Sequence, residues 1–271
     1  MKTARRRLVL ILILFLSWFA GLGLLDSAQE SRHRFAKSGD SFDPPLKKKV
    51  VDCGLSPYYD PRRNRRNELS CYSYSTFMVK QYDEGQKGSE WLAIVPIVGQ
   101  TAPECSLTHT ANEKVITYPE WSGYFMGGKG KLVFFSEADG FNAGMPFVVY
   151  DSQTGTKVFE DSYHDTSIFN RKVDSSPFNH MRVFEGRNGQ FSLKYLRVFE
   201  ANCDLNMEKY SCWEDVKKKL KLQNDEMPTC TGYKDIATRW ESAVAYPVEV
   251  TLFPKPVTKT IDGPVRCWPV D

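Results

Sequence analysis

The N-terminal segment most constrains what this 271-residue chain can become, because it sets the compartment in which the cysteines mature. Four basic residues precede an unbroken apolar run that starts at Leu8. A charged head before such a run is typical of an export signal. If the run ends at Ala20, the following Gly-Leu-Gly suits cleavage; if it continues to Leu25, it is just long enough to stay in a bilayer as an anchor. Either reading of residues 1–25 places the remaining chain outside the cytoplasm.

The charge balance depends on this leader. The full chain holds 36 basic and 33 acidic residues, a net charge of +3. Four of the basic residues precede Leu8, so 32 remain against 33 acidic ones once the leader is removed. We therefore expect no nucleic acid as a partner. A local cluster spans Arg62–Arg66 and is typical of a solvated loop, with contact to an anion or an envelope polymer as the alternative.

Residues 26–49 carry scattered charges, Ser, Gly and a Pro-Pro pair, but little apolar periodicity. Such a composition predicts a flexible tether. Residues 50–271 show no second change in composition and are long enough to bury a sizeable core. We therefore expect them to form a single β-rich domain braced by disulfides.

Alternating apolar residues interrupted by glycine turns dominate this domain. One segment, MPFVVYDSQTGTKVFED, turns at residues 152–155, and another turns at Asn188-Gly189, a dipeptide that tolerates positive φ. Segments beginning at Thr76 and Gly123 have the same organisation with looser turns. The pattern predicts a mainly β fold of antiparallel hairpins, arranged as an irregular propeller-like array or a sandwich. The hairpin around residues 152–155 resembles those in the blades of bacterial β-propellers, a likeness of architecture alone.

One short α-helix is predicted in the C-terminal half of the chain. Ser211 is placed to cap it, and Glu214 three residues later would complete a capping box. Apolar residues at Trp213, Val216 and Leu220 fall on one helical face, and Asn224 is a suitable stop. We expect this face to pack against the β scaffold.

Three chemistries compete for the cysteines. Zinc sites need closely spaced ligand pairs, which these spacings do not supply, and a catalytic thiol needs a histidine partner in a chain with only four histidines. In an oxidising compartment the remaining chemistry is disulfide formation. The disulfide candidates are Cys53, Cys71, Cys105, Cys203, Cys212, Cys230 and Cys267.

The predicted pairing leaves one thiol over, because the number of cysteines is odd. We predict one bridge within the group Cys203, Cys212 and Cys230. A second is predicted to join Cys53 to Cys71 or Cys105. Cys267 is predicted to hold the C-terminus in a third.

Two motifs with chemical associations are rejected. Gly123, Gly128 and Lys129 match part of a phosphate-binding loop, but Gly130 stands where Ser or Thr is needed, and a strand follows in place of a helix. The sequence SYHDTS holds every residue type of a hydrolytic triad, but groups this close along the chain cannot adopt the triad geometry.

The strongest candidate for a ligand site is a set of polar residues around residues 137–165. Calcium prefers clustered oxygen ligands in loops, and a pair of carboxylates could serve glycoside hydrolysis; ordinary polar turns are the third interpretation. The aromatic residues Trp91, Trp121, Tyr124 and Phe125 could line a sugar-binding surface or fill the core. The candidate ligand-binding residues are Glu137, Asp139, Asn142, Asp161, His164 and Asp165.

Two functional hypotheses follow. The first is an exported, non-catalytic binding or structural protein of the bacterial cell envelope, because no nucleophile, metal or cofactor signature stands out. The alternative is an extracellular hydrolase that acts on a glycan or an ester through the loop carboxylates. We expect no cofactor, with calcium as the one candidate, and an envelope or extracellular ligand as partner. Membrane contact is expected only through residues 8–25, and only if the signal is not cleaved. The protein would be periplasmic, secreted or anchored.

Overall fold

The computed structural model of the chain describes residues 42–58, 66–99, 101–140, 144–164, 178, 180–186, 188–233 and 240–270. The predicted leader at residues 1–25 lies outside these ranges, as do Asn142 and Asp165. No helix within the described ranges is long and apolar enough to span a bilayer.

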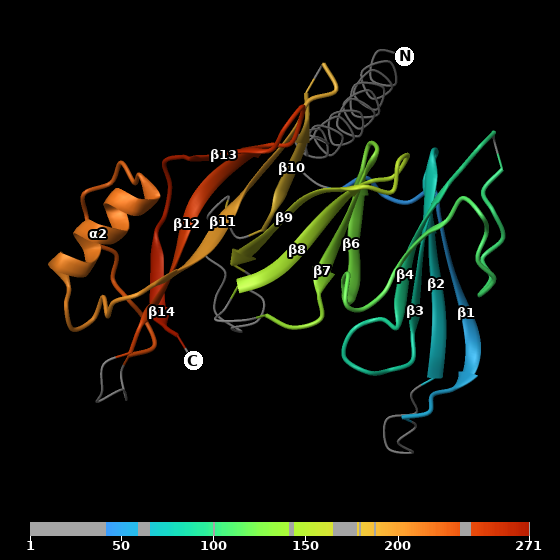
Figure 1. Cartoon of the computed structure of the whole chain (residues 1–271), viewed down its shortest axis with the longest axis horizontal. Coiled ribbons are helices and arrows are strands. Elements are labelled where there is room, and N and C mark those ends of the chain that lie inside the picture. The colour runs from blue at the N-terminus through green and yellow to red at the C-terminus, as the bar shows by residue number, and fades with distance from the viewer. Residues whose placement is uncertain are drawn as a thin grey trace, which may run out of the picture. The chain divides into compact units, whose positions relative to one another are not determined.

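Two antiparallel sheets make up the fold (Figure 1). The five-stranded sheet follows chain order, as β1 (Lys47–Leu55), β2 (Arg66–Ser73), β3 (Phe77–Asp83), β4 (Trp91–Pro96) and β5 (Lys114–Ile116). The nine-stranded sheet has the order β13 (Val257–Thr260), β12 (Ser242–Thr251), β11 (Phe191–Ala201), β9 (Lys157–His164), β8 (Gly144–Asp151), β7 (Leu132–Glu137) and β6 (Gly123–Lys129). Two further strands join it, β10 (Arg182–Glu185) beside β11 and β14 (Arg266–Pro269) beside β12.

The predicted mainly β fold is confirmed. All four predicted hairpins form, as β3–β4, β6–β7, β8–β9 and β10–β11. In the last of these Gly189 has a φ of 68°, the conformation for which the Asn-Gly turn was predicted. The sheets remain open, and side chains from both contribute to one buried cluster, which fits the sandwich alternative.

The two-residue period of β7 explains how one sheet serves two cores. Leu132 and Phe134 point to one face, where they join a cluster shared with β11 and β12. Val133 and Phe135 point to the other face, where they meet Phe77 and other residues of the five-stranded sheet. Because both faces are buried, the strand sequence LVFF is continuously apolar.

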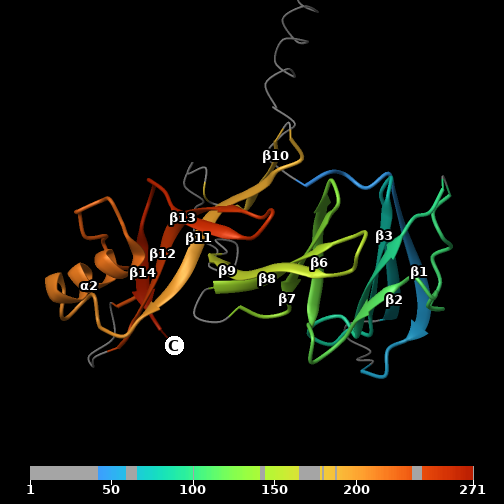
Figure 2. The same ribbon diagram turned by 45° about the horizontal axis from the view of Figure 1, so that its top comes forward.

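The predicted helix is α2 (Tyr210–Leu220), which lies beside β12 and β14 (Figures 1 and 2). Its predicted buried face is confirmed, since Trp213, Val216 and Leu220 all join the core. The predicted capping box is wrong. The cap position is Lys209, without a side-chain cap, because the Ser211 hydroxyl donates back to the Glu208 carbonyl.

The end of α2 also differs from the prediction. Lys221, not Asn224, adopts the left-handed conformation, with a φ of 56°. Three lysines in the last turn stabilise this end of α2, because their positive charges interact favourably with the negative end of the helix dipole. They are Lys217, Lys218 and Lys219.

Six cysteines form the three disulfides Cys71–Cys105, Cys203–Cys212 and Cys230–Cys267. The predicted bridge within the 203–230 group is confirmed, as is the role of Cys267. The predicted bridge from Cys53 is wrong, and Cys53 is a free thiol. Cys71 of β2 pairs with Lys49 of β1. Lys49 is four positions before Cys53, a separation of about 13 Å along a strand. A disulfide needs Cα atoms within about 7 Å.

The fold starts before residue 50. Phe42 packs its ring on Phe134 with centroids 5.1 Å apart, and Asp43 pairs with Gly128 at the edge of β6. The Asp43 carboxylate accepts hydrogen bonds from Lys129 Nζ and the Gly130 amide, each at 2.8 Å. Residues 42–49 of the predicted tether therefore belong to the β structure, where they connect the edge of one sheet to β1 of the other.

The cluster shared by the two sheets should contribute strongly to the stability of the fold. Phe135 is fully buried and contacts the Phe125 and Tyr150 rings at centroid distances of 6.1 and 5.9 Å. We predict that Phe135→Ala lowers the free energy of unfolding by about 3–5 kcal/mol, because it leaves a cavity between the sheets. Urea unfolding measures the loss. Val98→Ala, at a residue 85% exposed, is the control, and equal losses in the two variants would contradict the packing described.

Candidate functional site

The candidate residues on β7 and β9 divide between two faces of the sheet. Asp161 pairs with Phe147, whose ring belongs to the core shared with β11 and β12, so both side chains share that face. Glu137 lies two positions after Phe135 and therefore shares the face toward the five-stranded sheet. His164 is an odd number of positions from Asp161 and points away from it. The register thus separates Asp161 from the other two.

Asp161 connects two strands that have little backbone pairing. Among the described residues the β9–β11 ladder contains one pair, Tyr163 with Arg197. The buried Asp161 carboxylate accepts a hydrogen bond from the Tyr195 hydroxyl and another from Arg197 Nε at 2.8 Å. Burial and the neighbouring carboxylate raise the pKa of Tyr195 far above its usual range, so it donates at all ordinary pH values. Asp161 therefore links β9 to β11 through side-chain hydrogen bonds.

The remaining described candidates have separate partners. Asp139 is exposed and pairs with Lys87 of the β3–β4 connection. His164 is buried and stacks on Trp268 with ring centroids 4.8 Å apart. Glu137 has a raised pKa, because burial and the charges of Asp139 and Glu160 disfavour its ionised form. Within the described ranges no group of three His, Cys, Asp or Glu side chains could hold a metal ion.

The four aromatic residues for which a sugar-binding surface and core filling were the alternatives do not form one surface. Trp121 is buried between the sheets, where its Nε1 donates to the Ser136 carbonyl at 3.4 Å, and Phe125 packs against the same cluster. Tyr124 accepts a hydrogen bond from the Gly88 amide at 2.9 Å. Trp91 lies apart from them, on the opposite face of the five-stranded sheet.

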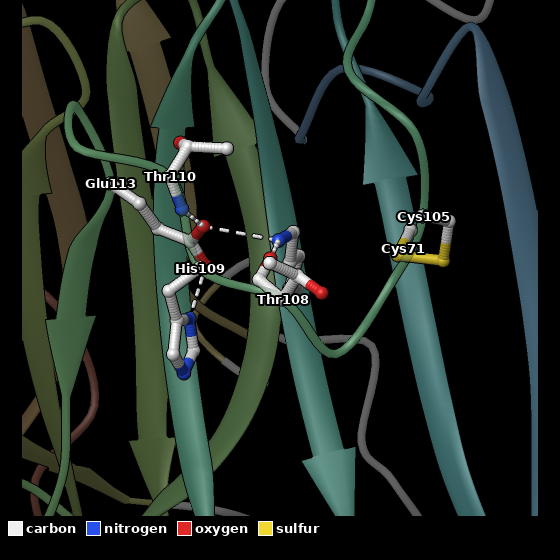
Figure 3. Close-up of polar contacts among 7 residues, drawn as sticks. Cys71, Cys105, Thr108, His109, Thr110 and Glu113 are labelled. Atoms are coloured by element: carbon white, nitrogen blue, oxygen red, sulfur yellow. Dashed lines mark hydrogen bonds and ion pairs between the residues drawn. A yellow bond between two sulfur atoms is a disulfide. The ribbon is translucent and has the colours of Figure 1, made fainter.

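That opposite face is called the outer face here, and Met78, Lys80 and Tyr82 of β3 point to it. A covering segment, residues 101–113, passes over part of it (Figure 3). The Cys71–Cys105 disulfide joins the segment to β2.

A buried ion pair also fixes the covering segment. Lys80 and Glu113 side chains are 1% and 0% exposed, and their Nζ and Oε2 atoms lie 3.0 Å apart. Lys80 also donates to the Thr108 carbonyl at 2.9 Å, while His109 and the Thr110 amide reach the Glu113 carboxylate at 2.9 and 3.0 Å (Figure 3). Burial alone would raise the pKa of Glu113, but these three donors outweigh it and lower the pKa.

The sequence held a signal for this ion pair that sequence reasoning missed. Lys80 occupies a position of β3 between Met78 and Tyr82, where the two-residue period expects an apolar residue facing the same side. A lysine at such a position requires a buried carboxylate partner. Its partner is 33 residues away, so no local pattern identifies Glu113.

The uncovered end of the outer face is the best candidate for a binding site. Tyr82 stacks on Trp91 at a centroid distance of 5.6 Å, and the Trp91 ring meets His109, which is 41% exposed, at 4.7 Å. The Tyr82 hydroxyl donates to Glu84 at 3.0 Å. Burial and the Glu84 carboxylate raise the pKa of Tyr82 to about 12, so the phenol stays protonated. Partly exposed rings beside a carboxylate form a surface suited to ligand contact.

Comparison of the chain with protein-family models, with curated proteins and with solved structures found no match. The candidate sites therefore rest on the geometry described above.

The Glu113 ion pair generates a pH-dependent prediction. We expect Glu113→Gln to lower the free energy of unfolding at pH 7 by about 3–5 kcal/mol, because it leaves the Lys80 charge buried without its partner. The folded pKa of Glu113 lies below its ordinary value of 4.5, so its contribution is complete above that value and lost as the pH falls through the folded pKa. The difference between wild type and variant should narrow over that acidic range.

Chemical denaturation at a series of pH values checks this. Glu104→Gln, an exposed position of the same covering segment, is the matched control and should cost less than about 0.5 kcal/mol. A loss in Glu113→Gln no larger than in the control, at every pH, would show that the ion pair does not hold the segment.

Asp161 yields a second prediction. Asp161→Asn should lower the free energy of unfolding by about 1.5–3 kcal/mol, because the Arg197 guanidinium and Tyr195 hydroxyl lose a charged acceptor. Asp139→Asn removes the exposed pair with Lys87 and should cost at most about 1 kcal/mol. Thermal unfolding of both variants makes the comparison. An unchanged Asp161→Asn variant would rule out the cross-strand role.

Proposed function

We propose that this chain is an exported, non-catalytic binding or structural protein of the bacterial cell envelope. The observation that carries the proposal is the placement of six of the seven cysteines in disulfides. Disulfides persist in oxidising compartments and are rare in the cytoplasm, so they indicate a non-cytoplasmic location. The finer assignment to an envelope comes from the sequence of residues 1–25 and is part of the proposal.

The polar groups of the fold favour binding over catalysis. Three ion pairs neutralise charged side chains within the fold. They join Lys80 to Glu113, Asp161 to Arg197, and Asp43 to Lys129. Such pairs hold strands and segments in place, and their own charged groups are neutralised by their partners. The uncovered end of the outer face supplies rings and a carboxylate that a ligand could reach.

An extracellular hydrolase of glycans or esters is the second candidate, and one observation favours it. Glu137 has a raised pKa and lies near Asp139 and Glu160, an environment that suits a general acid. Calcium at the loops of Glu137 and Asp139 likewise stays a prediction.

The experiment expresses the full chain with its own leader in a bacterial host and fractionates the cells. We expect the protein outside the cytoplasm, and we expect purified protein to sediment with isolated cell-envelope fragments. A panel of chromogenic glycosides and esters should show no turnover. Protein confined to the cytoplasm with reduced thiols would contradict the proposal. Turnover that Glu137→Gln abolishes, while the exposed control Glu241→Gln retains it, would establish the hydrolase in its place.

A further inference from the structure

The strand register gathers acceptors at the uncovered end of the outer face. Glu68 of β2 pairs with Asp83 of β3. Because the strands are antiparallel, Asn67, one position before Glu68, lies opposite Glu84, one position after Asp83. Asn67 alternates with Leu69 and Cys71, which are buried on the outer face, and therefore points to that side. Tyr82, whose hydroxyl donates a hydrogen bond to Glu84, also points to the outer face.

One acceptor at this end of the outer face is buried. Asn67 is 9% exposed, and its Oδ1 atom is buried without a hydrogen-bond partner among the described residues. A buried carbonyl oxygen without a donor costs free energy that a ligand N–H or O–H would recover. The unpartnered Asn67 Oδ1 therefore favours a ligand that donates a hydrogen bond.

The surrounding charge is negative. Glu84 alternates with Asp83 and shares the outer face with Tyr82, whereas Asp83 and Glu90 point to the opposite face. Burial and the charges of Glu84 and Asp83 raise the pKa of Glu90. None of these three carboxylates forms an ion pair with a described residue. Arg66 is next to Asn67 along β2 but points to the opposite face, where it pairs with Asp52 at 2.6 Å. Among the described residues, Glu84 is therefore without a paired cation on the outer face.

The stacked rings of Tyr82 and Trp91 are the third feature of the site. Tyr82 and Trp91 are both partly exposed, and a cation near their faces gains from the ring quadrupoles. A metal ion does not suit the site, since aromatic rings are not its ligands and no metal-binding group of three was found among the described residues. An ammonium group suits it, because it carries a positive charge and three N–H donors.

We propose that the uncovered end of the outer face binds a ligand through a primary ammonium group. Asn67 Oδ1 and the Glu84 carboxylate accept its hydrogen bonds, and the Tyr82 and Trp91 rings contact its charge and its methylene stem. This inference rests on the proposed binding function and names the chemistry of the ligand.

Isothermal titration of the purified protein tests the inference, with Nα-acetyl-lysine amide as the probe. We expect saturable binding of this probe and none of Nα-acetyl-norleucine amide, which lacks the ammonium group. The trimethylated lysine analogue should bind more weakly, because it has no N–H for Asn67. Glu84→Gln and Asn67→Leu should each weaken binding about tenfold, the cost of one hydrogen bond to a charged group. The control Glu241→Gln should bind as wild type does.

Cys53 provides a second readout that does not depend on heat. Its partly exposed thiol packs on the outer face, close enough to Tyr82 to add to the rise of that pKa. Bound lysine amide should slow alkylation of Cys53 by N-ethylmaleimide in wild type, and the norleucine amide should not. Folding of each variant is checked by its unfolding midpoint.

The outcomes separate the two proposals. Wild type that sediments with envelope fragments but neither binds lysine amide nor shows protection of Cys53 overturns the ammonium site and leaves the proposed function. Equal binding by wild type and the folded Glu84→Gln and Asn67→Leu variants also overturns the site. Loss of both sedimentation and amine binding overturns both proposals.

Discussion

Disulfide pairing is the constraint on which the rest of the structure depends. The sheets have their own buried clusters, but the less regular parts of the chain need covalent attachment to them. One bridge joins the covering segment to β2, a second joins the first turn of α2 to Cys203, two positions after β11, and a third joins the segment after α2 to β14. A disulfide typically stabilises a fold by about 2–4 kcal/mol, which is a large share of the stability of a domain. The three bridges are Cys71–Cys105, Cys203–Cys212 and Cys230–Cys267.

The covering segment shows how covalent and ionic constraints act together. Cys105 fixes one point of the segment, and Glu113 fixes another through Lys80 and the segment's own His109 and Thr110. Between these two points the segment covers part of the outer face (Figure 3). At the other end Tyr82 and Trp91 stay partly exposed, although His109 of the covering segment contacts the Trp91 ring, and Asn67 Oδ1 has no donor among the described residues. The same device that stabilises the five-stranded sheet therefore creates the surface that we propose binds a ligand.

The sequence was sufficient for features with local causes. A two-residue period and an Asn-Gly turn identify the β10–β11 hairpin, and helical spacing identifies the buried side of α2, including Trp213. Features that depend on distant partners could not be read in this way. The bridge predicted for Cys53 failed because only the β1–β2 register shows that it lies four positions from the row of Cys71. The helix start failed because Ser211 bonds a carbonyl before it, a choice that the capping pattern does not encode.

The candidate site shows the same limit. Residues close in sequence around 137–165 alternate between two faces of a sheet, so Asp161 and His164 point apart although three positions separate them. Asn67 and Glu84 come from different strands and meet only through the pairing of β2 with β3. Proximity along the chain therefore does not predict which side chains are neighbours in space, because strand register decides it.

Peptide mapping of the exported protein without reduction tests the central claim most directly. Free thiols are alkylated first, the protein is digested, and linked peptides are identified by mass. The account predicts three linked pairs that join Cys71 to Cys105, Cys203 to Cys212 and Cys230 to Cys267, with the alkyl label on Cys53 alone. Seven labelled cysteines and no linked peptides would contradict it, as would a bridge that includes Cys53.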